Sequence, residues 1–284
     1  MKEAIKKSET LIEALPYIKK FFEKTIVIKY GGAAVDEKGI DSAILEDIMF
    51  MNYAGMRLVV VHGGGPYISK MMKKSGIEPK FIGGRRYTDE ATLKIIDHAL
   101  AAINGRIVST LKGMGARVFA TSGRENNLIR AKKMDCGIDL GYVGEVTSVD
   151  TTVIKRLIKD NIIPVIYPIG LGRDRHMYNV NADDVASEIA VALKAEKFIL
   201  LTNVKGVLKD RKDPGSLCHT LKAVEAERLI KRKIIDGGMI PKARSCINAI
   251  KGGVKKAHIL DAGIPHALLL EMFTDKGIGT EIVR

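Results

Sequence analysis

The sequence predicts an α/β protein in which helices cover both faces of a mostly parallel sheet. Short runs of β-branched residues alternate with longer segments of helical periodicity from residue 25 to the end of the chain. The strand-like runs are almost entirely apolar, which is typical of parallel strands buried on both faces. The 284 residues, 46% of them hydrophobic, are enough to bury a large core in one domain or two fused lobes.

Residues 1–22 precede the first strand and form a helical pattern, with Pro16 expected to kink the helix. The apolar positions of this pattern are Ile5, Leu11, Leu15, Ile18 and Phe22. An amphipathic helix outside the core needs something to cover its apolar face. We therefore expect residues 1–22 to be a separate segment.

The first half of the chain alternates strands and helices. Pro66 is preset for a first helical turn, and Asp89 is expected to cap the longest helix. The predicted strands are residues 25–29, 58–61, 116–120, 128–132 and 141–149, and the predicted helices are residues 41–55, 66–75 and 90–111.

The second half continues this alternation, and Pro164 indicates that its strand lies at a sheet edge or that the proline lies at a strand end. We place a boundary near residue 195, between lobes of residues 25–194 and 195–284. The predicted elements are helices at residues 151–160 and 183–193, strands at 162–167, 198–201 and 257–260, and two helices between the last two strands.

Charge and composition exclude several classes of protein. The net charge is +13, but residues 222–256 hold ten Lys or Arg in a helical pattern, which favours a solvated helix face over a polyanion-binding surface. No nucleic-acid-binding motif accompanies the charge. No apolar run approaches the ~20 residues of a membrane span, and the N-terminus lacks a signal-peptide pattern. Three distant cysteines predict no disulfide framework, no zinc site and a cytoplasmic protein.

Two glycine loops follow predicted strands. Residues 29–32 read Lys-Tyr-Gly-Gly, and residues 62–66 read His-Gly-Gly-Gly-Pro and lead into a helix. Glycine lets backbone N–H groups approach an anion, and a helix N-terminus favours negative charge. Because parallel strands end at the same sheet edge, these loops predict a phosphate or carboxylate site. The P-loop and dinucleotide motifs are absent.

Two further helix starts carry polar residues. Asn179, Asn181 and Asp183 precede or open one helix, where capping is the simpler alternative to a site. Lys242 follows a glycine pair in the first turn of another helix. A lysine there opposes the helix dipole unless an anion lies beside it, so we favour a role in binding or catalysis.

Together these residues resemble the amino-acid kinase family, in particular its members that phosphorylate N-acetyl-L-glutamate. The motifs in order are KYGG, HGGGP, GxRxTD, NxNAD, LTxVxGV, GGMIPK and a GT near the C-terminus. The resemblance runs from Lys29 to Thr280. It implies a three-layer αβα sandwich and ATP-dependent phosphorylation of the γ-carboxylate of N-acetyl-L-glutamate, the second step of arginine biosynthesis. The first lobe would bind the amino acid and the second the nucleotide.

The resemblance also implies a role for each motif residue. Lys29 and Lys242 would stabilise the transferring phosphoryl group, and Asp183 would hold both ammonium groups. Mg²⁺ would be held largely by the phosphates of ATP, without a protein metal site. The implied substrate-binding residues are Gly64, Gly65, Arg86, Asn179 and Asn181, and the implied nucleotide-binding residues are Gly31, Gly32, Thr202, Asn203, Gly206 and Val207.

A C-terminal cluster resembles the arginine site of feedback-inhibited members. His258, Glu271 and Gly277 match its positions, and Tyr17 matches a tyrosine of the N-terminal helix that these members carry. In such members the helices interlace dimers into a hexamer, a trimer of dimers. The resemblance therefore implies a homo-oligomer inhibited by L-arginine. A nitrogen-signalling protein as partner is left open.

The chain departs from the family pattern at Ala33, Arg85, Tyr87 and Asn203. With Arg85 beside Arg86, either arginine is a candidate for gripping the substrate. A related acceptor, the aminoadipate end of a carrier-protein conjugate, remains an alternative. A non-catalytic basic regulatory protein is the other alternative, and the presence of Lys29, Lys242 and Asp183 argues against it.

Overall fold

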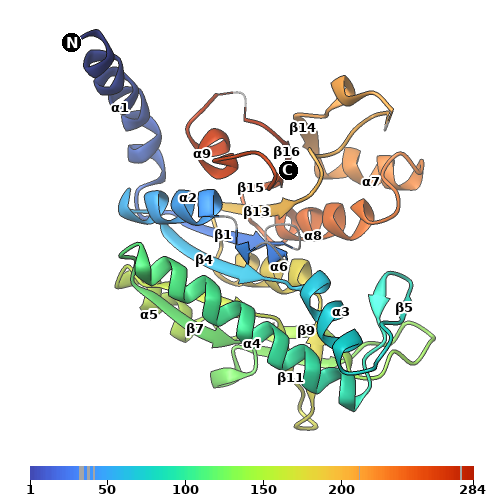
Figure 1. Ribbon diagram of the computed structural model, residues 1–284. Coiled ribbons are helices and arrows are strands. Elements are labelled where there is room, and N and C mark those ends of the chain that lie inside the picture. Colours follow the sequence, from blue (N-terminus) through green and yellow to red (C-terminus); the bar gives the residue numbers. More distant parts are fainter. Residues whose placement is uncertain (32–34, 37–38, 41, 211, 276) are drawn as a thin grey trace.

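The computed structural model describes residues 1–31, 35–36, 39–40, 42–210, 212–275 and 277–284. Its centre is an eight-stranded sheet in the order β14-β16-β15-β13-β1-β4-β10-β7 (Figure 1). Every neighbouring pair is parallel except β15 and β16, as the apolar strands predict. The strands are β1 (Thr25–Tyr30), β4 (Arg57–His62), β7 (Val118–Ser122), β10 (Ile163–Tyr167), β13 (Lys197–Thr202), β14 (Thr220–Lys222), β15 (Lys256–Asp261) and β16 (Thr280–Val283).

Helices cover both faces of this sheet and complete three layers. Successive strand residues face opposite sides, so Val27 packs in one core cluster while Ile26 and Ile28 pack in the other. The first face carries α5 (Thr152–Lys159), α6 (Ala182–Ala192), α7 (Ala223–Lys231) and α8 (Met239–Lys251). The opposite face carries α2 (Ser42–Tyr53), α4 (Glu90–Gly113) and α9 (Ala267–Met272). The predicted fold class is confirmed.

Smaller elements surround the strand ends. The hairpin β5 (Phe81–Ile82) and β6 (Arg85–Arg86) turns at Gly83 and Gly84, whose φ angles of +57° and +78° suit glycine. It lies near α3 (Gly65–Lys74) in Figure 1. The others are the hairpin β2 (Val35–Asp36) and β3 (Gly39–Ile40), a closed four-stranded unit of β8 (Ile129–Lys133), β9 (Val143–Val149), β11 (Ile169–Leu171) and β12 (Met177–Val180), and 3₁₀ turns at Glu125–Asn127 and Pro214–Ser216.

The N-terminal helix α1 (Lys2–Phe21) extends away from the rest of the molecule (Figure 1). It continues through Pro16, and its Leu11 and Leu15 are 66% and 51% exposed. Its last turn differs from the predicted pattern. Phe21 is 4% exposed and belongs to the same core cluster as the buried residues of α2, whereas Phe22 is 56% exposed. The C-terminal end of α1 therefore packs into the core, whereas the described part of the subunit leaves Leu11 and Leu15 largely exposed.

The environment of Pro164 decides between the two predicted alternatives, a sheet edge and a strand end. β10 is not an edge strand, because β7 lies outside it. Pro164 is instead the second residue of β10, and pairing with β4 begins only at Val165. The ring therefore lies at a strand end, where a missing N–H is tolerated. The predicted cap of α4 is confirmed, since Asp89 accepts a hydrogen bond from the Thr92 N–H at 2.8 Å. Among the described helices, none is long and apolar enough to cross a membrane.

Candidate functional site

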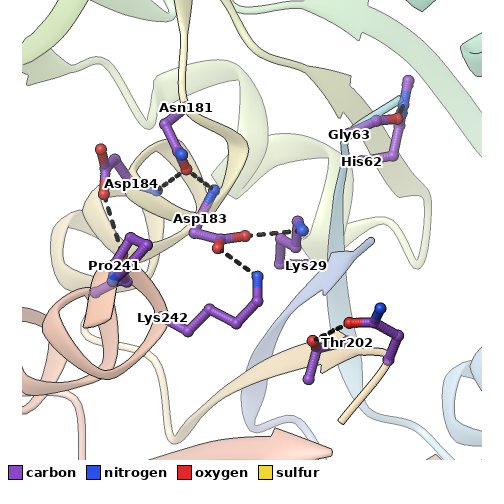
Figure 2. Close-up of polar contacts among 11 residues, drawn as sticks. Lys29, His62, Gly63, Asn181, Asp183, Asp184, Thr202, Pro241 and Lys242 are labelled. Carbon is purple, nitrogen blue, oxygen red and sulfur yellow. Dashed lines mark hydrogen bonds and ion pairs between the residues drawn. The ribbon is translucent and has the colours of Figure 1, made fainter. Parts of the chain in front are cut away.

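The carboxylate of Asp183 lies between two lysine ammonium groups at one edge of the sheet (Figure 2). Its Oδ1 is 2.8 Å from Nζ of Lys29, and its Oδ2 is 3.0 Å from Nζ of Lys242. Lys29 comes from the end of β1, Asp183 from the first turn of α6, and Lys242 from the first turn of α8. Three segments far apart in the sequence thus meet at a single carboxylate.

Burial and the neighbouring charges determine the protonation state of Asp183. Asp183 and Lys29 are only 5% and 7% exposed. Burial by itself raises the pKa of Asp183, but the nearby charges of Lys29 and Lys242 outweigh it and hold that pKa at about 2. At neutral pH the ionised carboxylate faces two lysines, so the cluster carries an excess positive charge at the N-terminus of α6. Such a centre stabilises a bound anion.

Asn181 caps α6, which decides the capping question that the sequence left open. Its Oδ1 accepts hydrogen bonds from the N–H groups of Asp183 at 2.7 Å and Asp184 at 3.3 Å. The Asp183 side chain is therefore free of capping and turns to the lysines. The oxygen of Asn181 is occupied by the helix, although the residue also lines a cavity beside the cluster.

A cavity of about 330 Å³ opens beside Lys29 and brings the predicted substrate-binding residues together. It lies at the carboxyl ends of β1 and β4, where open α/β sheets bind ligands. Asn179 reaches it from β12 and donates from Nδ2 to the Thr88 hydroxyl at 3.1 Å. Of the sequence-predicted residues, the lining contains Lys29, Gly64, Gly65, Arg86, Asn179, Asn181, Asp183 and Lys242.

The two neighbouring arginines have different surroundings. Arg86 is 8% exposed, and its Nη2 donates to the Gly65 carbonyl at 3.1 Å and to the Ser69 hydroxyl at 2.8 Å. Its guanidinium also lies 4.6 Å from the centre of the Phe81 ring. Burial lowers the pKa of its guanidinium below the usual value. Arg85 also lines the cavity, but its Nη2 is 3.6 Å from the carboxylate of Asp184. Of the two arginines, Arg86 is therefore the buried one, and hydrogen bonds fix its guanidinium.

A second cavity, of about 590 Å³, lies on the other side of Lys242. Asn203, Gly206 and Val207, three of the residues for which the resemblance implies nucleotide contacts, line this cavity. Gly206 has φ +142°, and a Cβ there would come within 2.5 Å of the Thr280 hydroxyl, which accepts the Val207 N–H at 2.8 Å. Only glycine fits this turn, and Lys242 lines both cavities.

The remaining predicted nucleotide residues lie at the margin. Thr202 ends β13 next to the second cavity rather than in its lining. Gly31 lies against Lys29, because an added Cβ would be 2.7 Å from the lysine Nζ and 2.5 Å from the Leu201 carbonyl. Gly32 and Ala33 lie outside the described residues.

Sequence reasoning missed two carboxylates, Asp236 and Asp261, in the second cavity. Asp261 ends β15, so the strand-end argument that found Lys29 also applies to it. Within the described part of the chain, no group of three or more His, Cys, Asp or Glu side chains forms a metal site. Mg²⁺ usually binds one or two carboxylates together with substrate phosphates. This lining fits a cation that arrives with a polyphosphate.

A second cluster lies where His258 of β15 meets residues 271–275 and 277–278. Nδ1 of His258 is 2.8 Å from Oε1 of Glu271, and Oε2 of Glu271 accepts the Ile278 N–H at 2.9 Å. A Cβ at Gly277 would lie 2.6 Å from that same oxygen. Tyr17 of α1 joins this segment, since its hydroxyl donates to Asp275 at 2.6 Å. The four residues of the predicted effector site therefore gather around one segment.

Lys197 is a buried charge beside this cluster that sequence reasoning missed. It opens β13, is 6% exposed, and its Nζ lies 5.1 Å from the Phe21 ring centre. Burial lowers its pKa to about 8, against the opposing attraction of Glu271. Burial also lowers the pKa of His258. In the sequence, a lysine at the start of an otherwise apolar strand could have indicated this buried charge.

Comparison with known proteins gives consistent matches. The model of the amino acid kinase family matches residues 24–261. An acetylglutamate kinase from Desulforamulus reducens is 48% identical over 282 residues, which cover 98% of this chain and 98% of that enzyme. An acetylglutamate kinase from Petrotoga mobilis is 49% identical over 283 residues, 99% of this chain and 95% of that enzyme.

A similar solved structure is the N-acetylglutamate synthase from Neisseria gonorrhoeae. Its complex with coenzyme A and N-acetyl-glutamate has a TM-score of 0.84 and 26% identity, over 98% of this chain and 63% of the synthase. Its complex with coenzyme A and L-arginine has a TM-score of 0.83, over 97% of this chain and 65% of the synthase. The chain thus spans less than two thirds of that longer protein.

Proposed function

The chain belongs to the amino acid kinase family, and within it to the acetylglutamate kinases, and on this premise we propose how its site works. It phosphorylates N-acetyl-L-glutamate with ATP. The cavity beside Lys29 takes the acyl amino acid, and the cavity of residues 203–208 takes the nucleotide. Residues 25–194 supply the lining of the first cavity apart from Lys242, and residues 195–284 supply the second. The observation that carries this assignment is that Lys242 lines both cavities while paired with Asp183.

The reaction needs charge neutralisation and no proton transfer. A γ-carboxylate is already ionised at pH 7, so its oxygen attacks the γ-phosphorus without a general base. The bond from that phosphorus to the β–γ bridging oxygen breaks, ADP leaves, and an acyl phosphate remains. Lys29 and Lys242 stabilise the charge on the transferring group from the two sides. Asp183 holds both ammonium groups ready, so little reorganisation is needed during the reaction.

Polar groups in the first cavity suit the rest of the substrate. Arg86 binds the α-carboxylate, because its three hydrogen bonds, to Met72, Gly65 and Ser69, leave two of its five N–H groups for a ligand. Gly64 and Gly65 offer backbone N–H groups at the start of α3. Asn179 and the amide nitrogen of Asn181 contact the acyl amino acid. Asp236 and Asp261 would hold Mg²⁺ with the phosphates, and the cation would add to the charge neutralisation.

An assay of acyl phosphate formation tests this function. Purified protein is given Mg·ATP and N-acetyl-L-glutamate, and the product is trapped with hydroxylamine as the hydroxamate. Aspartate, glutamate, carbamate and carrier-linked aminoadipate serve as competing acceptors. We expect turnover with N-acetyl-L-glutamate, and turnover ~10²–10³ lower in Lys29→Met. A preference for another acceptor, or equal turnover in the lysine variant, contradicts the proposal.

We also propose that L-arginine inhibits the enzyme by binding between α1 and the segments 271–275 and 277–278. Glu271 suits the guanidinium of the effector, and Lys197 suits its α-carboxylate. The similar synthase has been solved with L-arginine. The exposed Leu11 and Leu15 of α1 support an oligomer, a dimer or a hexameric trimer of dimers, in which a second copy covers the helix.

A further inference from the structure

His62 is a buried polar residue that the proposed chemistry leaves without a role. It ends β4, has no exposed surface, and directly precedes Gly63, Gly64 and Gly65. Its Nδ1 lies 3.0 Å from the carbonyl oxygen of Gly63. Both residues are labelled in Figure 2. Its Nε2 lies 3.1 Å from Nδ2 of Asn104 on α4. Both ring nitrogens therefore have a partner, one of them in the glycine loop.

The surrounding groups determine which nitrogen carries the proton. Nδ2 of Asn104 also lies 2.9 Å from the Val165 carbonyl, which can only accept. The amide nitrogen of Asn104 is thus the donor in both contacts, and Nε2 of His62 accepts. Burial, together with the charge of Lys29, lowers the pKa of His62 to about 4, so the ring is neutral at pH 7. Its single proton is on Nδ1 and is donated to Gly63.

This hydrogen bond orients the peptide between Gly63 and Gly64. Cis peptide bonds are absent from the described residues, so the N–H of Gly64 points opposite to the Gly63 carbonyl. The Gly63 N–H is fixed separately by the Tyr30 carbonyl at 3.1 Å. Gly64 is buried and lines the first cavity, and its N–H meets no acceptor within the described part of the protein. A Cβ on Gly63 would be 4.0 Å from Cε of Lys29, so this peptide lies beside the lysine.

We propose that His62 is a positioning residue, which holds the Gly63 carbonyl so that the Gly64 N–H faces the anion beside Lys29. The N–H adds a fixed hydrogen-bond donor to the positive charge of the two lysines. A preorganised donor contributes most where negative charge develops, on the transferring phosphoryl group and its acceptor. This inference rests on the proposed kinase function and adds a residue to its site.

Asparagine and leucine at position 62 make a matched pair. Both have a similar size, and both lose the contact to Asn104, but only asparagine keeps a donor near the position of Nδ1. We expect His62→Asn to retain kcat within a few-fold of wild type. His62→Leu should lose about 10- to 100-fold, less than the ~10²–10³ typical of removing a donor outright. The KM for N-acetyl-L-glutamate should change little in comparison.

The affinity for a transition-state mimic distinguishes a positioning role from a merely structural one. Binding of Mg·ADP with aluminium fluoride and N-acetyl-L-glutamate should weaken in His62→Leu by the same factor as kcat. Binding of N-acetyl-L-glutamate alone should stay near that of wild type. Equal kcat values in the two variants, or equal weakening of both ligands, overturn the inference.

His62→Gln covers the case in which His62→Leu does not fold. Glutamine keeps an acceptor toward Asn104 but reaches past Gly63, so it should behave as leucine does. Glutamine as active as asparagine would overturn the inference. If the wild-type protein does not phosphorylate N-acetyl-L-glutamate, the proposed function itself is wrong. If only the variants at position 62 behave differently from expectation, the inference about His62 is wrong and the proposed function stands.

Discussion

Nζ of Lys242 lies 3.0 Å from Oδ2 of Asp183, and this lysine also separates the two cavities of the site. A lysine in the first turn of a helix is locally unfavourable because the dipole repels it. The buried carboxylate offsets that repulsion and leaves the ammonium at the junction of the cavities. The pairing therefore explains why a positive charge is tolerated at the start of α8.

Replacement of either lysine by methionine should lower turnover with little effect on substrate binding. Methionine keeps the apolar stem of the side chain but removes its charge. We expect Lys29→Met or Lys242→Met to reduce kcat by ~10²–10³ and to raise KM for N-acetyl-L-glutamate far less. Steady-state kinetics on both variants test this. A double variant as fast as wild type rules out the lysines as the source of catalysis.

Variants of Asp183 and Asn181 should distinguish the effect of the carboxylate charge on activity from the effect of helix capping on stability. Asp183→Asn leaves two ammonium groups without their carboxylate, so activity per folded molecule should fall at least about tenfold. Asn181→Ala removes the cap of α6 and should cost about 1 kcal/mol of unfolding free energy. Melting temperature and specific activity are measured on both variants. A loss of activity in Asp183→Asn that merely follows its loss of stability contradicts the charge role.

The two arginines should differ in kinetics. Arg86→Ala removes the inward guanidinium and should raise KM for N-acetyl-L-glutamate by ten-fold or more, since charged hydrogen bonds are worth about 1.5–3 kcal/mol. KM for ATP should be nearly unchanged. Arg85→Ala is the matched control and should have little effect. Reversed results would show that Arg85 grips the substrate.

Acid should destabilise the protein through its buried histidine. The pKa of His62 is lowered to about 4 from 6.5, so between these pH values the unfolded chain binds a proton that the folded chain excludes. His62 therefore leaves the free energy of unfolding unchanged above pH 6.5. It lowers that free energy as the pH drops toward 4, by up to about 3 kcal/mol. His258 contributes with the same sign. Urea unfolding across this range should give a flatter profile for His62→Asn, and an unchanged profile contradicts the assignment.

Shortening α1 should weaken the inhibition of catalysis by L-arginine. Deletion of residues 1–16 leaves the buried Phe21 in place, whereas deletion of residues 1–22 also removes a core side chain. We expect the shorter deletion to convert a hexamer to a dimer and to weaken inhibition by L-arginine, with basal turnover retained. Light scattering and an arginine titration measure both properties.

Tyr17→Phe is the milder companion of that deletion. It keeps the ring beside Phe273, 6.1 Å between centres, but removes the hydrogen bond to Asp275. We expect weaker arginine inhibition in an unchanged oligomer. A truncated protein that is still hexameric and fully arginine-sensitive would refute the proposed role of α1 without affecting the kinase assignment.

Local sequence patterns were sufficient for the parallel sheet and for much of the site. Apolar strands, helix starts and glycine loops are local features, so Lys29, the 63–65 loop and Lys242 could be recognised before any contact was known. Elements of two or three residues, such as β5 and β6, were missed because they are too short to show a period. The same holds for β14 and for the six-residue α9.

Contacts between distant segments were decided only by the tertiary structure. The motif favoured Arg86 over Arg85 but gave no contact that distinguishes the two, and only the packing of the β5–β6 hairpin on α3 buries Arg86 and leaves Arg85 near Asp184. The sequence likewise placed Phe22 rather than Phe21 on the buried stripe, because the helical period ignores how α1 meets the sheet. The sequence by itself determined which residues bear charge and where backbones turn. Sheet order determined which of them meet, since a parallel sheet brings strand ends together that lie hundreds of residues apart.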